Sequence, residues 1–476
     1  MAKKFHKSLI IALFIIIITI FGSNTLSTLP VNSSSNRSTK IDMVAGTIKL
    51  GATVSETGAY STEGIRLQNG YQMAIADINN AGGVKVGASY YNLSLTLYDD
   101  QSDKTVAAQK YDTLINTDGV DLLLGPYSST IVLSVAPVAE SSQIPMVQAG
   151  GSADAIYQQG YQYIFGLYHP GSTYTEPIFA YLNDTNHNSD IRSVAIFLEN
   201  SAFPISVTNG TDKFLASAGI TNVKVYTYTS GDLDAIATNM VDLASNGGAD
   251  MIISCGHYAD LVKLTQEVYA ENLHPKVVFG TIGVDEPTFV TAVGSQSEQI
   301  SGFSQWLPNL PETTAPGITN FITAYKLKFG ETPAYHAAGG YAAIQVVKAA
   351  LEKAGTYTNH NAVRDALASL NVDTLWGNVQ FASTGVIKNS GYMVQIQKST
   401  IETVYPAAYA TANFIYPMFL FTPHTTSTTL SSTSSTSLTS STSLTQSTSS
   451  IPTSDGFGFG LLLSTIMVIF WKRKRQ

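Results

Sequence analysis

The sequence predicts an α/β protein of two doubly wound parallel-sheet lobes with a ligand cleft between them. Short apolar strands alternate with amphipathic helical segments from about residue 46 to 147, and the alternation starts again past residue 190. Of the 476 residues, 44% are apolar and 13% are charged, which provides for a sizeable core and excludes wholesale disorder. Ligands of such sheets bind outside the carboxyl ends of the strands, so two units predict a cleft between them.

The first unit opens with a strand, because Ile48, Leu50, Ala52 and Val54 recur at every second position. Further strands are expected at 93–97, 120–124 and 144–147. Apolar residues at helical spacing predict helices at 64–79, 106–115 and 130–141. The resulting order, β-α-β-α-β-α-β, is typical of a parallel sheet covered by helices on both faces.

The second unit repeats this order. Strands are expected at 194–198, 223–228, 251–254 and 277–280, with helices at 206–218, 233–245 and 259–270 between them. Two further helices are expected at 335–354 and 362–370, and residues 392–397 and 401–405 indicate a closing hairpin.

The charge distribution argues against a nucleic-acid partner. The net charge is −8, and seven of the 26 basic residues lie in the first seven and last five positions of the chain. The remaining 19 basic residues are outnumbered by 34 acidic ones. Contacts to the phosphates of a nucleic acid need a positively charged surface. Because Cys255 is the one cysteine, an intrachain disulfide and a cysteine-ligated zinc site are excluded.

The two ends of the chain indicate export. Three lysines precede the apolar run 9–21, as in a secretory signal, and an uncleaved N-terminal anchor is the alternative. Residues 425–450 are almost entirely Ser and Thr, which predicts an extended, O-glycosylated stalk. A Gly-Phe repeat at 456–460, an apolar run at 461–471 and a basic end follow, and this pattern resembles archaeal C-terminal surface-anchoring signals. A short membrane anchor is the plainer interpretation.

These segments set the expected organisation. We expect a signal and spacer at 1–41, a ligand-binding body at 42–421, a stalk at 422–455 and an anchor or sorting signal at 456–476. The body would then lie on the extracellular face of the membrane. Five Asn-x-Ser/Thr sequons fit an exported glycoprotein, at Asn32, Asn36, Asn92, Asn183 and Asn209.

Motifs for common enzyme chemistry are missing from the body. It has no Walker loop, His-Glu-x-x-His, Gly-x-Ser-x-Gly or dinucleotide fingerprint, and none of its histidines are paired at metal-ligand spacing. We therefore expect a binding protein rather than an enzyme, with no cofactor and no metal.

Several segments together resemble the leucine/isoleucine/valine-type solute-binding proteins of ABC importers, which have the type I periplasmic-binding fold. The resemblance runs from about 46 to 406. The segments that carry it are Ile48-Lys-Leu-Gly-Ala, Ser55-Glu-Thr-Gly58, Ala76-Asp-Ile-Asn79-Asn-Ala-Gly-Gly83, Leu97-Tyr-Asp-Asp100, Leu124-Gly-Pro-Tyr-Ser-Ser129, Ala136-Pro-Val-Ala-Glu140, Gly340-Tyr-Ala-Ala and Trp376-Gly-Asn-Val-Gln-Phe381.

The resemblance implies two interleaved lobes joined by three chain crossings, near 166, 302 and 380. Lobe one would comprise about 46–166 and 303–380, and lobe two about 167–302 and 381–421. It also implies a monomer that closes by hinge motion on a small-molecule ligand, and whose closed form a membrane permease recognises.

Lobe one supplies four expected ligand contacts by this resemblance. Ser129 falls on the family's serine that meets the ligand carboxylate, with Ser128 beside it. Ser129 opens a helix, where unpaired N–H groups favour an anion, and a helix cap alone is the alternative. Gly150 and Ser152 fall on the family's second contact group, a backbone carbonyl and a hydroxyl, with an ordinary polar loop as the alternative.

Lobe two supplies less distinctive positions. Phe203 falls where the family has an aromatic residue over the ligand, and a core phenylalanine is the alternative. His257 aligns with another family aromatic, with Tyr258 adjacent, and a surface histidine after a strand is the alternative.

The expected partner of a ligand ammonium is missing. The family's amino-acid binders carry an acidic residue after the strand that ends here at Gly280, and Ile282 occupies that position. Burying an unpaired ammonium is costly. A free amino acid therefore requires that Glu63, in the first strand–helix loop, or Asp285 take over, and amides, carboxylates and short peptides stay open.

Two other functional classes compete with a solute-binding protein. One is a surface-tethered ectodomain that senses a ligand, although residues 472–476 are too few for a cytoplasmic signalling domain. The other is an enzyme or a structural surface protein.

Overall fold

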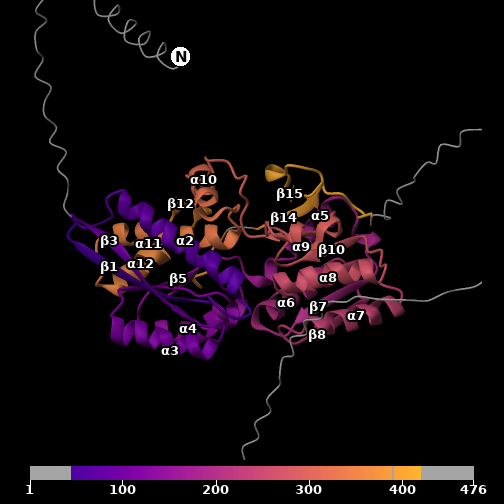
Figure 1. The fold of residues 1–476 in the computed structure, drawn as a ribbon, viewed down its shortest axis with the longest axis horizontal. Helices are drawn as coiled ribbons and strands as arrows, with labels where there is room; N and C mark the ends of the chain where they lie inside the picture. The colour runs from indigo at the N-terminus through magenta and orange to yellow at the C-terminus, as the bar shows by residue number, and fades with distance from the viewer. Residues whose placement is uncertain (1–43, 389–390, 420–476) are drawn as a thin grey trace, which may run out of the picture. The chain divides into compact units, whose positions relative to one another are not determined.

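The computed structural model describes residues 44–388 and 391–419, which contain two large β-sheets and one two-stranded sheet (Figure 1). The predicted signal, stalk and anchor lie outside the described residues. Within these residues, no helix is both long and apolar enough to span a membrane.

The first sheet has six strands in the order β2-β3-β1-β4-β5-β6. Its strands pair in parallel, except for the antiparallel hairpin of β2 and β3. The strand bounds are β1 (Gly46–Val54), β2 (Val84–Val86), β3 (Ser89–Asp99), β4 (Leu122–Leu124), β5 (Met146–Gln148) and β6 (Ile164–Gly166).

Helices cover both faces of this sheet. Helices α3 and α4 lie on one face and α2 and α11 on the other, with α12 against α11 (Figure 1). The helix bounds are α2 (Ser61–Asn80), α3 (Lys104–Thr113), α4 (Ser129–Ser141), α10 (Ile318–Phe329), α11 (Tyr335–Ala354) and α12 (His360–Ala368). The lobe also carries the small hairpin β12 (Val372–Thr374) and β13 (Gly377–Val379).

The uninterrupted apolar character of β4 follows from these two layers. Successive side chains of a strand point to opposite faces. Leu122 and Leu124 accordingly join the core under α2 and α11, whereas Leu123 joins Val132 and Val135 of α4.

The second sheet has seven strands in the order β15-β14-β11-β10-β9-β7-β8. Strands β7 to β11 pair in parallel. The hairpin expected from residues 392–397 and 401–405 is present as β14 and β15, and β14 pairs antiparallel with β11. The strand bounds are β7 (Val194–Glu199), β8 (Val223–Tyr228), β9 (Met251–Cys255), β10 (Val277–Gly280), β11 (Ser301–Ser304), β14 (Tyr392–Gln397) and β15 (Thr400–Tyr405).

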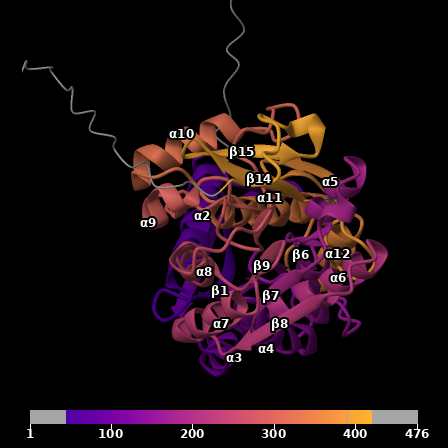
Figure 2. The same ribbon diagram turned by 90° about the vertical axis from the view of Figure 1, so that its right-hand side faces the viewer.

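Helices again form two layers, with α7 and α8 on one face and α5 and α6 on the other (Figure 2). The helix bounds are α5 (Glu176–Asp184), α6 (Ala202–Ser217), α7 (Leu233–Ser245), α8 (Tyr258–Ala270) and α9 (Phe289–Val293). Each face of the sheet has its own apolar core, and alternate residues of β9 contribute to one or the other. Ile252 packs in the core that includes α8, and Ile253 packs in the core that includes α6.

The chain passes between the two sheets three times. It leaves the first sheet after β6 and returns to that lobe after β11. Val386 still pairs with Gly166 beside the first sheet, so the last crossing lies between Val386 and Tyr392.

Candidate functional site

A narrow cavity lies where the carboxyl ends of the strands of both lobes meet. Its lining residues are Tyr127, Ser128, Ser129, Gly150, Ser152, Tyr168, Tyr174, Phe203, His257, Ile282 and Tyr335. Six of the nine residues predicted to bind ligand are among them: Ser128, Ser129, Gly150, Ser152, Phe203 and His257. The parallel arrangement accounts for this convergence, because β4, β5, β9 and β10 all end at this edge.

The start of α4 presents two serine hydroxyls to the cavity. Ser128 is the N-cap residue, but its side chain makes no cap hydrogen bond, and its buried hydroxyl has no partner within the described residues. The Ser129 Oγ accepts hydrogen bonds from the backbone N–H groups of Ser152 at 2.9 Å and Ala153 at 3.0 Å. Because the lone pairs of Ser129 are occupied, its hydroxyl proton remains available to a ligand oxygen.

The loop after β5 approaches α4 closely. A Cβ atom on Gly150 would come within 2.0 Å of the Pro126 carbonyl oxygen, so only glycine fits. The N–H groups of Gly150 and Gly151 are held by the Gln148 side-chain oxygen at 2.9 and 2.7 Å. These contacts fix the loop that carries Ser152.

Ser152 connects the first lobe to the second. Its hydroxyl lies 2.6 Å from the hydroxyl of Tyr174, which follows the first chain crossing. The side-chain amide of Gln305, next to the second crossing, donates to the Tyr174 hydroxyl as well. Burial raises the pKa of Tyr174, so this phenol stays protonated and can serve as a donor.

His257 forms a second connection across the cavity. Its Nδ1 lies 3.1 Å from the Tyr127 hydroxyl of lobe one, and its Nε2 lies 3.3 Å from Glu199 Oε2. Glu199 ends β7 and is only 1% exposed. The sequence prediction missed Glu199, although it directly follows the expected strand 194–198, where a functional side chain belongs.

His257 also begins α8. Its backbone N–H donates to the Asp260 carboxylate at 2.7 Å, which closes a capping box. Burial raises the pKa of Asp260 to about 6, while the nearby His257 opposes this shift. Glu199, His257 and Asp260 therefore form a cluster of buried ionisable side chains on the lobe-two wall.

Charged side chains join the lobes at a third point. Arg66 of α2 forms an ion pair with Glu286, which lies in the loop after β10, and Glu286 Oε1 is 2.9 Å from His336 Nδ1. The exposed fractions of the Arg66 and Glu286 side chains are 6% and 1%. Removing one partner of a buried ion pair is strongly destabilising, so this contact helps to hold the two lobes against each other in this structure.

The side chains nearly fill the cavity between the lobes. About 220 Å³ between its walls is free of atoms, but only about 10 Å³ is wide enough for water. This is about the space of a single water molecule. A ligand as large as an amino acid therefore requires the lobes or the lining side chains to move.

A sequence model of a periplasmic binding protein family matches residues 47–400. The chain belongs to this family. Among its relatives is the Leu/Ile/Val-binding protein homolog 7 of Brucella suis biovar 1 (strain 1330), which is 26% identical over 386 residues, covering 78% of this chain and 94% of that protein. The homolog 8 of Brucella abortus (strain 2308) is 26% identical over 391 residues, covering 77% and 92%.

Solved structures of periplasmic binding proteins share the fold. The leucine-binding protein LivK of Thermotoga maritima MSB8 aligns with a TM-score of 0.66 at 21% identity, covering 75% of this chain and 97% of that one. A solute-binding protein of R. palustris in complex with benzoate also gives 0.66, at 17% identity, covering 79% and 100%. The predicted fold class, two parallel-sheet lobes of the type I periplasmic-binding kind, is thereby confirmed.

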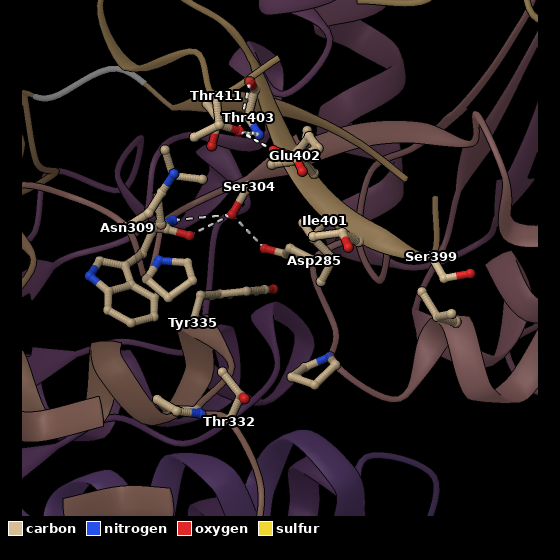
Figure 3. Close-up of a pocket in the computed structure, with 18 of the residues that line it drawn as sticks. Asp285, Ser304, Asn309, Thr332, Tyr335, Ser399, Ile401, Glu402, Thr403 and Thr411 are labelled. Carbon is tan, nitrogen blue, oxygen red and sulfur yellow. Dashed lines mark hydrogen bonds between the residues drawn. The ribbon is translucent and has the colours of Figure 1, made fainter. Parts of the chain in front are cut away.

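Three predicted site residues of this periplasmic binding protein lie outside the cavity lining. Tyr258 is the first residue of α8, next to His257. Glu63 is 4% exposed and makes no hydrogen bond or ion pair within the described residues, while its charge raises the pKa of Tyr127, second to burial. Asp285 lines a neighbouring cavity (Figure 3), and Tyr335 belongs to the walls of both.

Ile282 lies in the cavity wall, where the family's ammonium partner was expected. Three acidic side chains act on residues of this wall: Glu199 on His257, Glu63 on Tyr127, and Asp285 on Tyr168, Tyr174 and Tyr335. An amino group in the cavity would have to reach one of these carboxylates.

Proposed function

We propose that this periplasmic binding protein is the solute-binding component of an ABC importer, and that it captures a small organic solute with a carboxylate or amide end. The observation that carries the proposal is the buried, unpartnered Ser128 hydroxyl beside Ser129, facing Phe203 and His257 of the other lobe. Curated relatives named for Leu, Ile and Val binding and structures named as ABC transporter proteins support the transport role.

The carboxylate end of the solute would lie at the start of α4. Two hydroxyl donors and the free N–H groups of a helix N-terminus converge there. The Ser152 hydroxyl would bind the same end from the loop after β5. Donor groups of this kind bind a carboxylate or an amide carbonyl through the same oxygen atoms. The Gly150 N–H is held by Gln148, so Gly150 would offer its carbonyl oxygen, which accepts from an N–H group of the solute rather than from a carboxylate.

The other end of the solute would meet an apolar and aromatic surface. Phe203, Tyr174, Tyr335 and Ile282 line it, which suits a branched alkyl group or an aromatic ring. A branched-chain amino acid would additionally need Glu199 or Glu63 for its ammonium group. A carboxylate that lacks the amine, or the corresponding amide, avoids this requirement because Ile282 offers no ammonium partner.

Hinge closure would deliver the bound solute to a membrane permease. The lobes meet through Tyr127–His257, Ser152–Tyr174 and Arg66–Glu286, so a ligand held by both walls stabilises the closed form. A surface-tethered sensor would use the same closure, but the relatives' names favour transport. The protein would act as a monomer without catalysis or cofactor.

We further propose that the body, about 42–421 with the lobe boundaries given above, is displayed outside the cell. Residues 1–41 would direct export, 422–455 would form the glycosylated stalk, and 456–476 would anchor or sort the protein. Protease treatment of intact cells tests this arrangement. The body should be released by cleavage in the stalk, and a body protected until lysis would contradict it.

A thermal-shift screen with matched ligands tests the solute class. Leucine, 4-methylpentanoate and 4-methylpentanamide share one alkyl chain and differ only in their polar groups. We expect the acid or the amide to raise the unfolding temperature more than leucine does, because Ile282 replaces the ammonium partner. A larger shift with leucine would assign the amine to a carboxylate of the cavity, and no shift with small acids, amides or amino acids would contradict the proposed function.

A further inference from the structure

A second cavity lies beside the cleft, around the second chain crossing (Figure 3). Its volume is about 480 Å³. This falls within the range of roughly 300–1,000 Å³ that is usual for small-molecule sites. Both lobes contribute to it. Residues between Asp285 and Val290 follow β10, and residues between Ser304 and Asn309 form the crossing. Thr332 and Pro333 precede α11, which Tyr335 begins, and Ser399–Thr403 belongs to the β14–β15 hairpin.

The lining of this cavity is acidic. Asp285 and Glu402 are its two carboxylic residues, and the lining includes no lysine, arginine or histidine. Hydroxyl groups of serine, threonine and tyrosine make up most of its other polar groups. Val290, Leu307 and Ile401 provide an apolar wall. Such a mixture suits a small cation that carries an apolar group.

Among the polar side chains that line this cavity, Asp285 has a buried carboxylate oxygen without a hydrogen-bond donor in the described part of the chain. Its Oδ2 accepts a hydrogen bond from the Ser304 hydroxyl at 2.6 Å, but its buried Oδ1 has no partner within the described residues. Figure 3 shows the Tyr335 hydroxyl directed toward the same carboxyl group. Leaving a buried acceptor without a donor costs about 1–3 kcal/mol, and more when the acceptor is charged.

The cation nearest to Asp285 is already engaged. Arg66 is paired with Glu286 and lies 3.4 Å from Glu331. A metal ion is a poor candidate, because the described residues contain no group of three or more His, Cys, Asp or Glu side chains that could hold one. An organic ammonium needs fewer charged ligands, since its N–H groups also donate to hydroxyl oxygens.

We propose that this cavity is a second binding site, which takes a small primary ammonium ion on a short apolar body. The ammonium donates to Asp285 Oδ1, and the apolar body lies against Val290, Leu307 and Ile401. Glu402 adds negative charge to the site, while its own carboxylate accepts a hydrogen bond from Thr411. The site shares Tyr335 with the cleft but has its own carboxylates, so the proposal does not depend on which solute the cleft binds.

Calorimetry with isobutylamine at about pH 8.5 tests the proposal, because the Asp285 carboxyl, whose pKa burial raises to about 7, is then ionised and the amine is still protonated. Isobutanol serves as a neutral probe of the same shape. The intact protein should bind isobutylamine saturably with one site and should bind isobutanol at least tenfold more weakly. Asp285→Asn should weaken isobutylamine binding at least tenfold, whereas Asp112→Asn, on the exposed face of α3, should leave it unchanged. Equal binding of both probes, or of the Asp285→Asn and parent proteins, would overturn the proposal.

A second variant covers the possibility that Asp285→Asn fails to fold, and it locates the probe. Val290 lines this cavity and not the cleft, so Val290→Trp fills the proposed site while leaving Asp285 in place. A folded Val290→Trp protein should lose isobutylamine binding at least tenfold. Unchanged binding would place the amine elsewhere and overturn the assignment of this cavity.

Discussion

Ser129 holds two parts of the site together. Its Oγ accepts two backbone N–H groups of the loop that carries Ser152, and its proton remains for a ligand. Ser129→Ala should weaken binding of the best ligand by about 1–3 kcal/mol, the usual cost of losing a hydrogen bond to a charged group. Calorimetry measures this loss. Ser134→Ala is the matched control, since that hydroxyl lies on the same helix and bonds to the Lys104 carbonyl; equal affinities of the two variants would leave Ser129 a structural residue.

Asp285 makes stability depend on pH. Burial raises the pKa of its carboxyl from 3.8 to about 7, while Ser304 and Arg66 oppose this shift and the facing phenols of Tyr335, Tyr168 and Tyr174 are neutral. The pKa of this carboxyl is higher in the folded protein than in the unfolded chain. The stability that the protonated carboxyl contributes is therefore fully present below pH 3.8 and is lost as the pH rises to about 7.

We expect Asp285→Asn to remove this loss. The unfolding temperature of the variant, relative to the parent, should rise from pH 4 to pH 7 and then level off. Thermal unfolding monitored by circular dichroism at several pH values checks this. Asp112→Asn, which changes an exposed carboxylate, is the control. The difference in unfolding temperature between this variant and the parent should not change with pH. The same constant difference for Asp285→Asn would contradict the prediction.

The site residues differ in how far the sequence could reveal them. Ser129 and Gly150 follow predicted strands and fall on family motifs, so position in the chain was sufficient to choose them. Glu199 was missed because the expected strand stopped one residue before it. Its proximity to His257 arises from the pairing of β7 with β9, which brings together residues 58 positions apart.

Among the secondary structure elements, the apolar pattern decided what could be predicted. Helix α4 and the β14–β15 hairpin lie within a residue or two of their expected bounds, because their apolar periodicity extends over several residues. The short strands β4 and β10 were predicted because they are continuous apolar runs, whereas β11, Ser-Gly-Phe-Ser, has one large apolar residue and β6 has two before Gly166. Pairing with neighbouring strands defines these two. Helix α10 was missed too. Its Leu327 is 89% exposed, so the apolar residues of this segment do not all lie on one face and their spacing does not indicate a helix clearly.

The contact between α2 and the loop after β10 should contribute strongly to stability. Arg66→Met would leave Glu286 buried beside His336 without its arginine partner. We expect a loss of about 3–5 kcal/mol in the free energy of unfolding, as when one member of a buried pair is removed. Denaturant unfolding measures it.

Two further variants distinguish pairing from packing at this contact. Arg66→Met combined with Glu286→Met should recover part of the loss, because no charge then stays buried alone. Arg192→Met is the control, since that side chain is 81% exposed and lies 3.8 Å from Asp250. If Arg66→Met were no more destabilising than Arg192→Met, the ion pair would not hold the lobes together.

At the scale of the whole molecule, the proposed function requires the two lobes to close on the solute. Three chain crossings connect them, and the cleft between them has room for about one water molecule in this structure. A solute can enter only if the lobes separate or the lining side chains move. A solute that contacts both walls binds the closed form more tightly than the open form. The difference between these two affinities sets how far the solute shifts the protein toward the closed form.

Small-angle scattering should detect this closure. We expect the radius of gyration of the protein to fall when a ligand from the thermal-shift screen reaches saturation. The forward scattering should stay unchanged, as the proposed monomer requires. A solute that gives no thermal shift is the control and should leave the curve unaltered. If a ligand saturated the cleft lined by Ser129 and Ser152 without any fall in the radius of gyration, side-chain movement alone would admit the ligand. The hinge mechanism would then be wrong for this protein.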